Sequence, residues 1–205
     1  MDFEKIISRV GSSIVVFFHR VVRLAFSPYK TMRSIARDDD MIQLALIILS
    51  IGGYFYIADK LRQYEHHPFL LFSLTLVHFL LTVGFFALLQ MATTNEKEIK
   101  IKPALLVFGY ALIPTLVWFL ANSWLYYVLP PPRTVSLLGK GFSILYISFS
   151  IAILIWKIIT MYLAVRLVTR FTFYRIFYSL LLYGACMIPY SLFLYSLRLF
   201  RIPFL

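Results

Sequence analysis

The sequence predicts an all-α integral membrane protein that crosses the bilayer with five helices. Its composition indicates a membrane environment, because 61% of the 205 residues are hydrophobic and only 14% are charged. Soluble domains contain about 45–50% apolar and about 25% charged residues. The second observation is a set of five apolar stretches, each long enough to cross about 30 Å of hydrocarbon as a helix.

The five predicted spans are separated by short polar segments. They lie near residues 41–58, 69–90, 104–127, 142–165 and 175–198. Long runs without strict apolar–polar alternation indicate helices rather than the strands of a barrel. The first stretch is only just long enough and the third and fifth contain proline, so four and six spans are the alternatives. The chain therefore divides into a segment outside the bilayer, 1–40, and a five-helix domain, 41–205.

The distribution of Lys and Arg predicts the orientation of the chain in the membrane. Thirteen of these cations lie in the N-terminal segment and in the second and fourth loops, whereas six lie in the other loops and at the C-terminal end. Because short cytoplasmic loops are enriched in Lys and Arg, we expect a cytoplasmic N-terminus and an outside C-terminus. The cations are spread between apolar runs rather than gathered on one folded face, which argues against nucleic-acid binding.

Residues 3–26 have polar residues at helical spacing and apolar residues between them, the pattern of an amphipathic helix. We expect this helix to lie in the interface, with its basic face on anionic headgroups. The members of that face are Lys5, Arg9, Arg20 and Arg23. A second helix is expected to begin at Ser27-Pro28, with the serine as its cap. Asp40 and Gln43 predict the N-cap of the first span.

The third and fifth spans share a pattern that indicates an internal repeat. Gly109 and Pro114 recur as Gly184 and Pro189, at an offset of 75 residues. The second and third spans would then match the fourth and fifth as two parallel hairpins, with the first span added. Proline frees the carbonyl four residues earlier, and glycine lets a neighbouring helix approach closely. The kinked helices would enclose either a tight core or a small polar cavity.

Four polar residues form a candidate intramembrane site. Lys157 lies in the fourth span, and no acid falls inside a predicted span. An ionisable residue at that depth is a functional hypothesis, with snorkelling to the interface as the alternative. Its candidate partners are the freed carbonyls, Tyr110, Tyr183 or a lipid phosphate. His78 in the second span is expected to bond a Ser or Thr of a neighbouring helix, with proton relay as the alternative.

Signatures of catalysis and of cofactor binding are missing from the sequence. It contains no His-Glu-x-x-His, no Gly-x-Ser-x-Gly, no phosphate-binding Gly-rich loop and no Cys-x-x-Cys. The adjacent His66 and His67 make a poor metal site without further ligands. We therefore expect a protein that is not an enzyme and has no cofactor or metal.

Several short motifs, taken in order along the chain, resemble the Yip1 family of five-span membrane proteins. They are Ser27-Pro28 with Thr31 to Arg37, Lys102-Pro103 before Gly109-Tyr110 and Ile113-Pro114, and Trp156-Lys157 before Tyr162. The resemblance runs from about Phe26 to the end of the chain. It implies a cytoplasmic N-terminus and a five-helix domain without known enzymatic chemistry. Eukaryotic members of the family act as adaptors in vesicle traffic and bind Rab-type GTPases.

The chain looks more like the short prokaryotic branch of that family. It lacks the long Pro/Gly-rich arm and the Asp-Leu-Tyr-Gly-Pro motif of the eukaryotic members. GTPase binding is therefore not expected, and the expected location is a prokaryotic cytoplasmic (inner) membrane. The resulting hypothesis is a non-enzymatic membrane adaptor or assembly factor that binds a partner membrane protein. The alternative is a small transporter or lipid-handling protein with a mid-membrane site at the kinked third and fifth spans.

Overall fold

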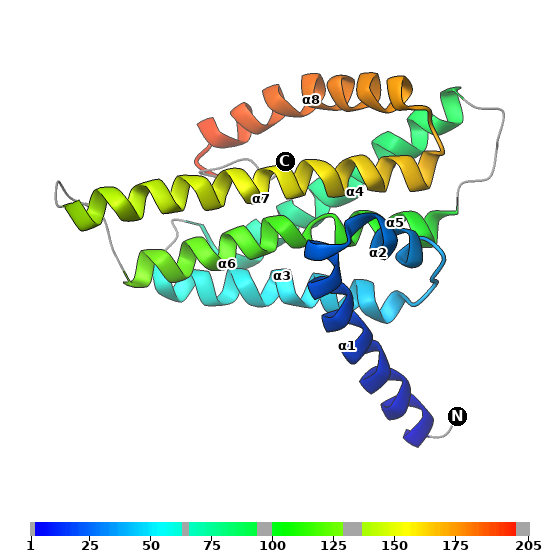
Figure 1. The fold of residues 1–205 in the computed structure, drawn as a ribbon, viewed down its shortest axis with the longest axis horizontal. Coiled ribbons are helices and arrows are strands. Elements are labelled where there is room, and N and C mark those ends of the chain that lie inside the picture. Colours follow the sequence, from blue (N-terminus) through cyan, green and yellow to red (C-terminus); the bar gives the residue numbers. More distant parts are fainter. Residues whose placement is uncertain (1–2, 63–65, 94–99, 129–136, 200–205) are drawn as a thin grey trace.

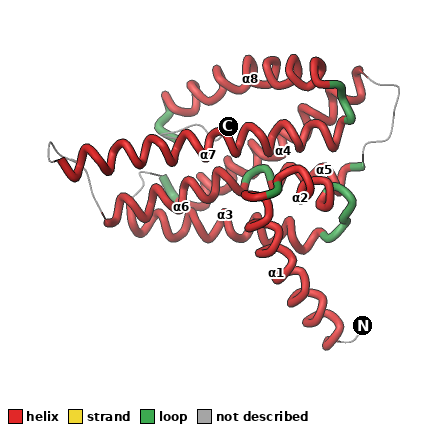
Figure 2. The backbone as a smooth tube through the Cα atoms, in the orientation of Figure 1, coloured by secondary structure: helices red, strands yellow, loops and turns green. Residues whose placement is uncertain are grey.

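The computed structural model describes residues 3–62, 66–93, 100–128 and 137–199, which form eight α-helices and contain no strand (Figure 1 and Figure 2). The helices are α1 Phe3–Phe26, α2 Pro28–Ile35, α3 Met41–Arg62, α4 Pro68–Thr93, α5 Ile101–Tyr110, α6 Ile113–Val128, α7 Leu137–Thr169 and α8 Phe173–Ser196. α3, α4, α7 and α8 and the pair α5–α6 run along one common direction, and α1 crosses that direction (Figure 1).

Within the described residues, five helical stretches are apolar and long enough to cross a membrane, which agrees with the predicted number of spans. Their bounds are Met41–Leu61, Pro68–Thr93, Ile101–Leu125, Gly139–Thr169 and Phe173–Ser196. The predicted ends lie within four residues of these bounds. The expectation that no acid falls inside a span is wrong for the first one, because its apolar helical stretch continues to Leu61 and includes Asp59. A single acid near the end of a long apolar stretch does not prevent the helix from continuing through it.

α5 is the most enclosed helix of the bundle, since six of its ten residues are buried. It packs against α2, α3, α4 and α7, and α8 lies at the edge, against α7 and α4 (Figure 1). Most outward side chains of α7 are apolar; Ile147, Ile151 and Leu154 are each more than half exposed. An exposed apolar surface of this kind suits hydrocarbon rather than water.

The third span is broken, whereas the fifth is not. α5 ends at Tyr110 and α6 begins at Ile113, and the amide of Leu112 bonds the carbonyl of Gly109 at 3.0 Å in a tight turn. Pro114 follows this turn and has no N–H to continue the helical bonds. In contrast, α8 runs through Pro189 as one helix. The two prolines that the sequence pattern matched therefore have different structural consequences.

The two matched glycines differ as well. A Cβ on Gly109 would lie 2.9 Å from Cδ1 of Leu44, whereas a Cβ on Gly184 would meet no atom within 4 Å. Gly109 thus lets α3 and α5 approach closely, as expected, and the same expectation for Gly184 is wrong. The difference follows from position, because α5 is enclosed and α8 lies at the edge of the bundle. These differences between the matched prolines and glycines do not support the predicted internal repeat.

The start of α2 matches the sequence prediction only in part. Pro28 is the first helical residue, but the side chain of Ser27 makes no capping hydrogen bond. Instead, the carbonyl of Ser27 accepts bonds from the amide and the hydroxyl of Thr31 at 3.1 Å and 2.9 Å. At the next helix, Oδ1 of Asp40 accepts a bond from the amide of Ile42 at 3.2 Å, so the predicted cap of the first span is confirmed.

Candidate functional site

Lys157 reaches the break in the third span. Its Nζ donates to the carbonyl of Ala111 at 3.0 Å. Carbonyls at such a break lack their usual helical donors, and a lysine ammonium supplies one. The sequence pattern identified the carbonyl of Tyr110 as the freed acceptor, and the structure places the bonded carbonyl one residue later. The cause is the tight turn of Leu112 onto Gly109, which breaks the helix before Pro114.

Lys157 lies deeper in its span than the sequence predicted. α7 continues to Thr169, twelve residues beyond Lys157, which corresponds to a rise of about 18 Å. The sequence placed the end of this span near residue 165, so it gave a depth of only eight residues. The ammonium group is therefore held near the middle of α7 by a protein carbonyl, rather than extended to the nearer end of the helix.

A small cavity lies beside this bond. Its volume is about 50 Å³, and its lining includes Lys157, His78, Tyr183 and Ala111. A cavity needs at least about 10–15 Å³ of such space to hold one water molecule, so this one has room for a few waters or a small ion. It is far below the roughly 300–1,000 Å³ of pockets that bind drug-sized ligands. Three of the four predicted intramembrane polar residues thus meet around one cavity, and Tyr110 is not among them.

His78 has an unusual environment for a buried histidine. Its side chain is 8% exposed, and its Nε2 has no hydrogen-bond partner within the described part of the chain. The ring stacks on Tyr190 of α8, with centroids 5.8 Å apart. Nε2 of His78 therefore does not form the expected hydrogen bond to a Ser or Thr of a neighbouring helix. A buried polar atom of this kind usually bonds a water or an ion.

The hydrogen-bond directions around Tyr183 can be assigned from a shared hydroxyl. Thr82 donates its only proton to the carbonyl of His78 at 2.9 Å. The 2.8 Å contact between Thr82 Oγ1 and Tyr183 Oη must then run from the tyrosine to the threonine. The tyrosine oxygen keeps its acceptor lone pairs, while the ammonium of Lys157 keeps two further protons. The cavity therefore offers both donors and acceptors to a small polar guest.

Tyr110 belongs to a different polar group, which links the N-terminal helices to the bundle. Its hydroxyl donates to Oε1 of Gln43 at 2.6 Å, and Nη1 of Arg20 donates to the same oxygen at 2.7 Å. Arg20 also forms a salt bridge with Asp38 at 2.7 Å. We call this group, with Asp40, the Arg20 cluster. It joins α1, the α2–α3 connection, α3 and α5.

Asp40 extends the Arg20 cluster toward the start of α1. Its Oδ2 accepts a 2.6 Å bond from Ser13 and a 3.1 Å bond from the Gln43 amide. Burial alone would raise the pKa of this carboxyl. The bonds from Ser13, Gln43 and the amide of Ile42, with the charge of Arg9, outweigh burial and lower the pKa below its ordinary value. Asp40 is therefore ionised when it accepts the hydrogen bond from Ser13 that attaches α1.

The predicted basic face of α1 is only partly directed outward. Arg9 and Arg23 are exposed, whereas Arg20 faces the bundle with its side chain 13% exposed. The side chain of Lys5 lies outside the described residues. α1 is also attached by apolar contacts, since Leu24 is fully buried and its carbonyl accepts a bond from the indole of Trp156 at 3.2 Å. The prediction of a headgroup contact is therefore wrong for Arg20, because packing turned this side of α1 inward.

Comparisons with family models, curated proteins and solved structures found no match. The resemblance to the Yip1 family therefore stays a prediction. Within the described ranges, no group of three or more His, Cys, Asp and Glu side chains is placed to hold a metal ion. The candidate functional features are therefore the mid-span cavity and the Arg20 cluster.

Proposed function

We propose that this protein is a non-enzymatic membrane adaptor or assembly factor that binds a partner membrane protein. The observation that supports this most directly is the Arg20 cluster, which makes α1 and α2 an integral part of the bundle. The outward sides of these helices carry cations, including Arg9, Arg23, Lys30 and Arg33. A cationic module fixed to the spans can couple contact at a membrane surface to the helices inside the bilayer.

The proposed setting is a prokaryotic cytoplasmic membrane with the N-terminus inside, following the distribution of Lys and Arg. The proposed partners are anionic headgroups for α1 and another membrane protein for the apolar outer faces of the spans. Nucleic acid and GTPases are not proposed as partners. The small size of the mid-span cavity favours an adaptor over a carrier of organic substrates, because its volume of about 50 Å³ is far below the roughly 300–1,000 Å³ of pockets for drug-sized ligands.

Affinity purification tests this proposal directly. The full-length tagged protein is taken from its native membranes into nanodiscs, and everything retained is identified by mass spectrometry. We expect a second membrane protein in stoichiometric amount. The variant R9Q/R23Q should recover less of it. The control K60Q/K140Q removes two exposed cations, one near the end of α3 and one near the start of α7, and should recover the wild-type amount. Recovery of the tagged protein alone would reject the adaptor proposal.

The mid-span cavity supports a second candidate function, a small transporter. Lys157, His78 and Tyr183 present a cation, an unpartnered ring nitrogen and a hydroxyl oxygen where the hydrocarbon would lie. Such groups in transporters mark the paths of small ions and protons. Proteoliposomes loaded with a pH-sensitive or halide-sensitive dye test this candidate. Flux above protein-free liposomes that disappears in K157M would support it, and wild-type flux equal to the protein-free control would reject it.

A further inference from the structure

Lys157 carries a charge in the middle of the bundle, and its bonded partner is neutral. The side chain is half-buried on α7 and donates to the carbonyl of Ala111, which is a dipole without net charge. The acid within the described spans, Asp59, lies near the end of α3 and does not line the mid-span cavity. Hydrocarbon cannot hydrate an ion. An ammonium at this depth therefore either loses its proton or is paired with an opposite charge.

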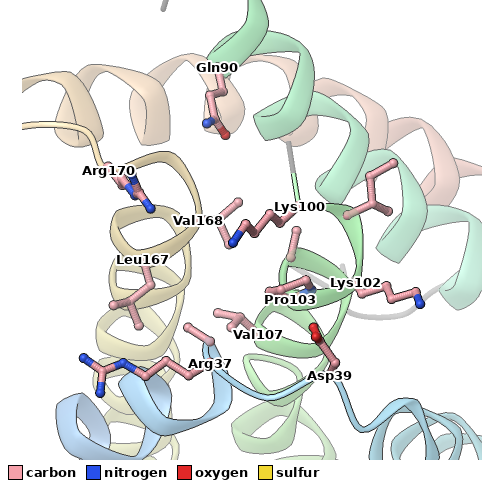
Figure 3. A pocket seen from close by; sticks show the side chains of 13 residues that line it. Arg37, Asp39, Gln90, Lys100, Lys102, Pro103, Val107, Leu167, Val168 and Arg170 are labelled. Carbon is pink, nitrogen blue, oxygen red and sulfur yellow. The ribbon is translucent and has the colours of Figure 1, made fainter. Parts of the chain in front are cut away.

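A second, larger pocket at the ends of the spans offers a contrast. It is lined by Lys100 and Lys102, where α5 begins, and also by the acid Asp39 (Figure 3). Lysines at the ends of spans can reach water and headgroups with their flexible side chains. Among the described residues that line the mid-span cavity, in contrast, none is acidic. These side chains therefore provide no opposite charge for Lys157.

A second nitrogen is available at the mid-span cavity. His78 of α4 lies on its wall with its side chain 8% exposed, and its Nε2 has no hydrogen-bond partner in the described part of the chain. With its proton on Nε2, the imidazole is a donor. The ammonium of Lys157 keeps two protons besides the one that bonds Ala111. Two helices thus present N–H groups that one guest could accept together.

The volume and the charge of the cavity select the kind of guest. The volume of about 50 Å³ exceeds the 10–15 Å³ that one water needs and is far below the roughly 300–1,000 Å³ of pockets for drug-sized ligands. A water molecule would accept the hydrogen bonds but leave the ammonium without an opposite charge. A small anion accepts the same bonds and also attracts the ammonium, much more strongly at low dielectric than in water.

We propose that the mid-span cavity binds one monatomic anion of halide size, chloride being the probe, with Lys157 and His78 as its ligands. The inference rests on the second candidate function, because it names the ion held by that same site. It does not require transport, since a resident anion would join α4 to α7 beside the break in the third span. Binding and flux are therefore measured separately.

Thermal unfolding of the full-length protein in an uncharged detergent tests the binding. Sodium chloride replaces sodium gluconate at constant ionic strength, because gluconate is an organic anion too large for the cavity. We expect the Tm of the wild-type protein to rise saturably, by about 3–6 °C at about ten times the Kd. K157M should lose this rise, whereas K140M, which removes an exposed charge from the same helix, should keep it.

The role of His78 is tested by two substitutions at the same position. H78L removes the donor and should raise the Kd for chloride about tenfold or more, because a hydrogen bond to a charged group is lost. H78Q keeps an N–H donor and should stay within about threefold of wild type. Broadening of the chloride NMR signal measures the Kd directly. If K157M does not fold, the comparison of H78L with H78Q decides the proposal.

The contrary results are equally specific. A wild-type Tm that does not depend on chloride assigns the cavity to water and rejects the anion. The same rise in K157M and K140M places the anion elsewhere, and equal Kd values for H78L and wild type reject His78 as a ligand. Chloride binding without halide flux in proteoliposomes rejects the transporter and supports this site. Halide flux without saturable binding rejects this site and leaves the transporter.

Discussion

The ammonium of Lys157 and the carbonyl of Ala111 lie 3.0 Å apart, and their bond joins the middle of α7 to the break between α5 and α6. Interhelical hydrogen bonds in membranes contribute about 0.6–2 kcal/mol. We therefore expect K157M to lower the free energy of unfolding by about 1 kcal/mol, or a Tm shift of about 2–4 °C in a chain of this size. Thermal unfolding in detergent measures the shift. The exposed K140M, on the same helix, is the control. A K157M variant as stable as wild type would show that burial of the ammonium cancels the bond.

Pro114 is expected to be the reason that Lys157 finds a free acceptor. P114A restores an N–H that can bond the carbonyl of Tyr110, and a continuous α5–α6 helix would also supply a backbone donor to the carbonyl of Ala111, the acceptor of Lys157. The cost of K157M should then shrink by about half or more in the P114A background. P189A, in the continuous helix α8, should leave that cost unchanged. A double-mutant cycle of Tm values measures the coupling. If K157M lowered the stability equally in the wild-type, P114A and P189A backgrounds, the bond of Lys157 would not depend on the break.

Gly109 and Gly184 should respond oppositely to alanine. The new Cβ at Gly109 meets Cδ1 of the buried Leu44 at 2.9 Å, whereas at Gly184 no atom lies within 4 Å. G109A should cost about 1 kcal/mol, because only the end of one leucine must move. G184A should be neutral or stabilise by up to about 1 kcal/mol, because alanine favours the helix. Parallel unfolding curves compare the two. The same sign of change in both would contradict the difference in their packing.

Arg20 should hold α1 to the bundle. R20Q removes the salt bridge to Asp38 and the bond to Gln43, and hydrogen bonds to charged groups contribute about 1.5–3 kcal/mol. We expect cleavage within α1 by limited proteolysis to become about tenfold faster or more. The protease used should not recognise arginine, because both variants remove one. The control R23Q also removes one charge from α1 at an exposed position, and it should be cleaved at the wild-type rate. Equal rates for R20Q and wild type would show that apolar contacts suffice.

Asp40 should make the attachment of α1 sensitive to acid. Its pKa is lowered in the folded protein, so its contribution is present above the unfolded pKa of about 3.9 and is lost as the pH falls through the folded value. Proteolysis of α1 by an acid-active protease should therefore accelerate below about pH 4. D40N should be cleaved faster at neutral pH and show less acid dependence, whereas the exposed D39N should follow wild type. An identical acid profile for D40N and wild type would exclude Asp40 as the titrating group.

The number and approximate bounds of the spans could be predicted from sequence, because the free energy of placing a helix in hydrocarbon depends on the apolar residues within that one stretch. The cap at Asp40 and the helix start at Pro28 were predictable for the same reason, since each depends on neighbouring residues. Helix ends were less so: the fourth span was predicted to end near residue 165, whereas both its apolar stretch and α7 continue to Thr169. This moved Lys157 toward mid-span.

Tertiary packing decided how the polar residues are grouped. Tyr110 and Tyr183 were one predicted site, yet Tyr110 bonds Gln43 and Tyr183 lines the cavity with Lys157. Arg20 was predicted to face headgroups and instead joins Asp38. Sequence determines which residues are polar and their spacing around one helix. The rotation of each helix about its axis, and hence the partner of each polar side chain, depends on packing between helices far apart in the chain.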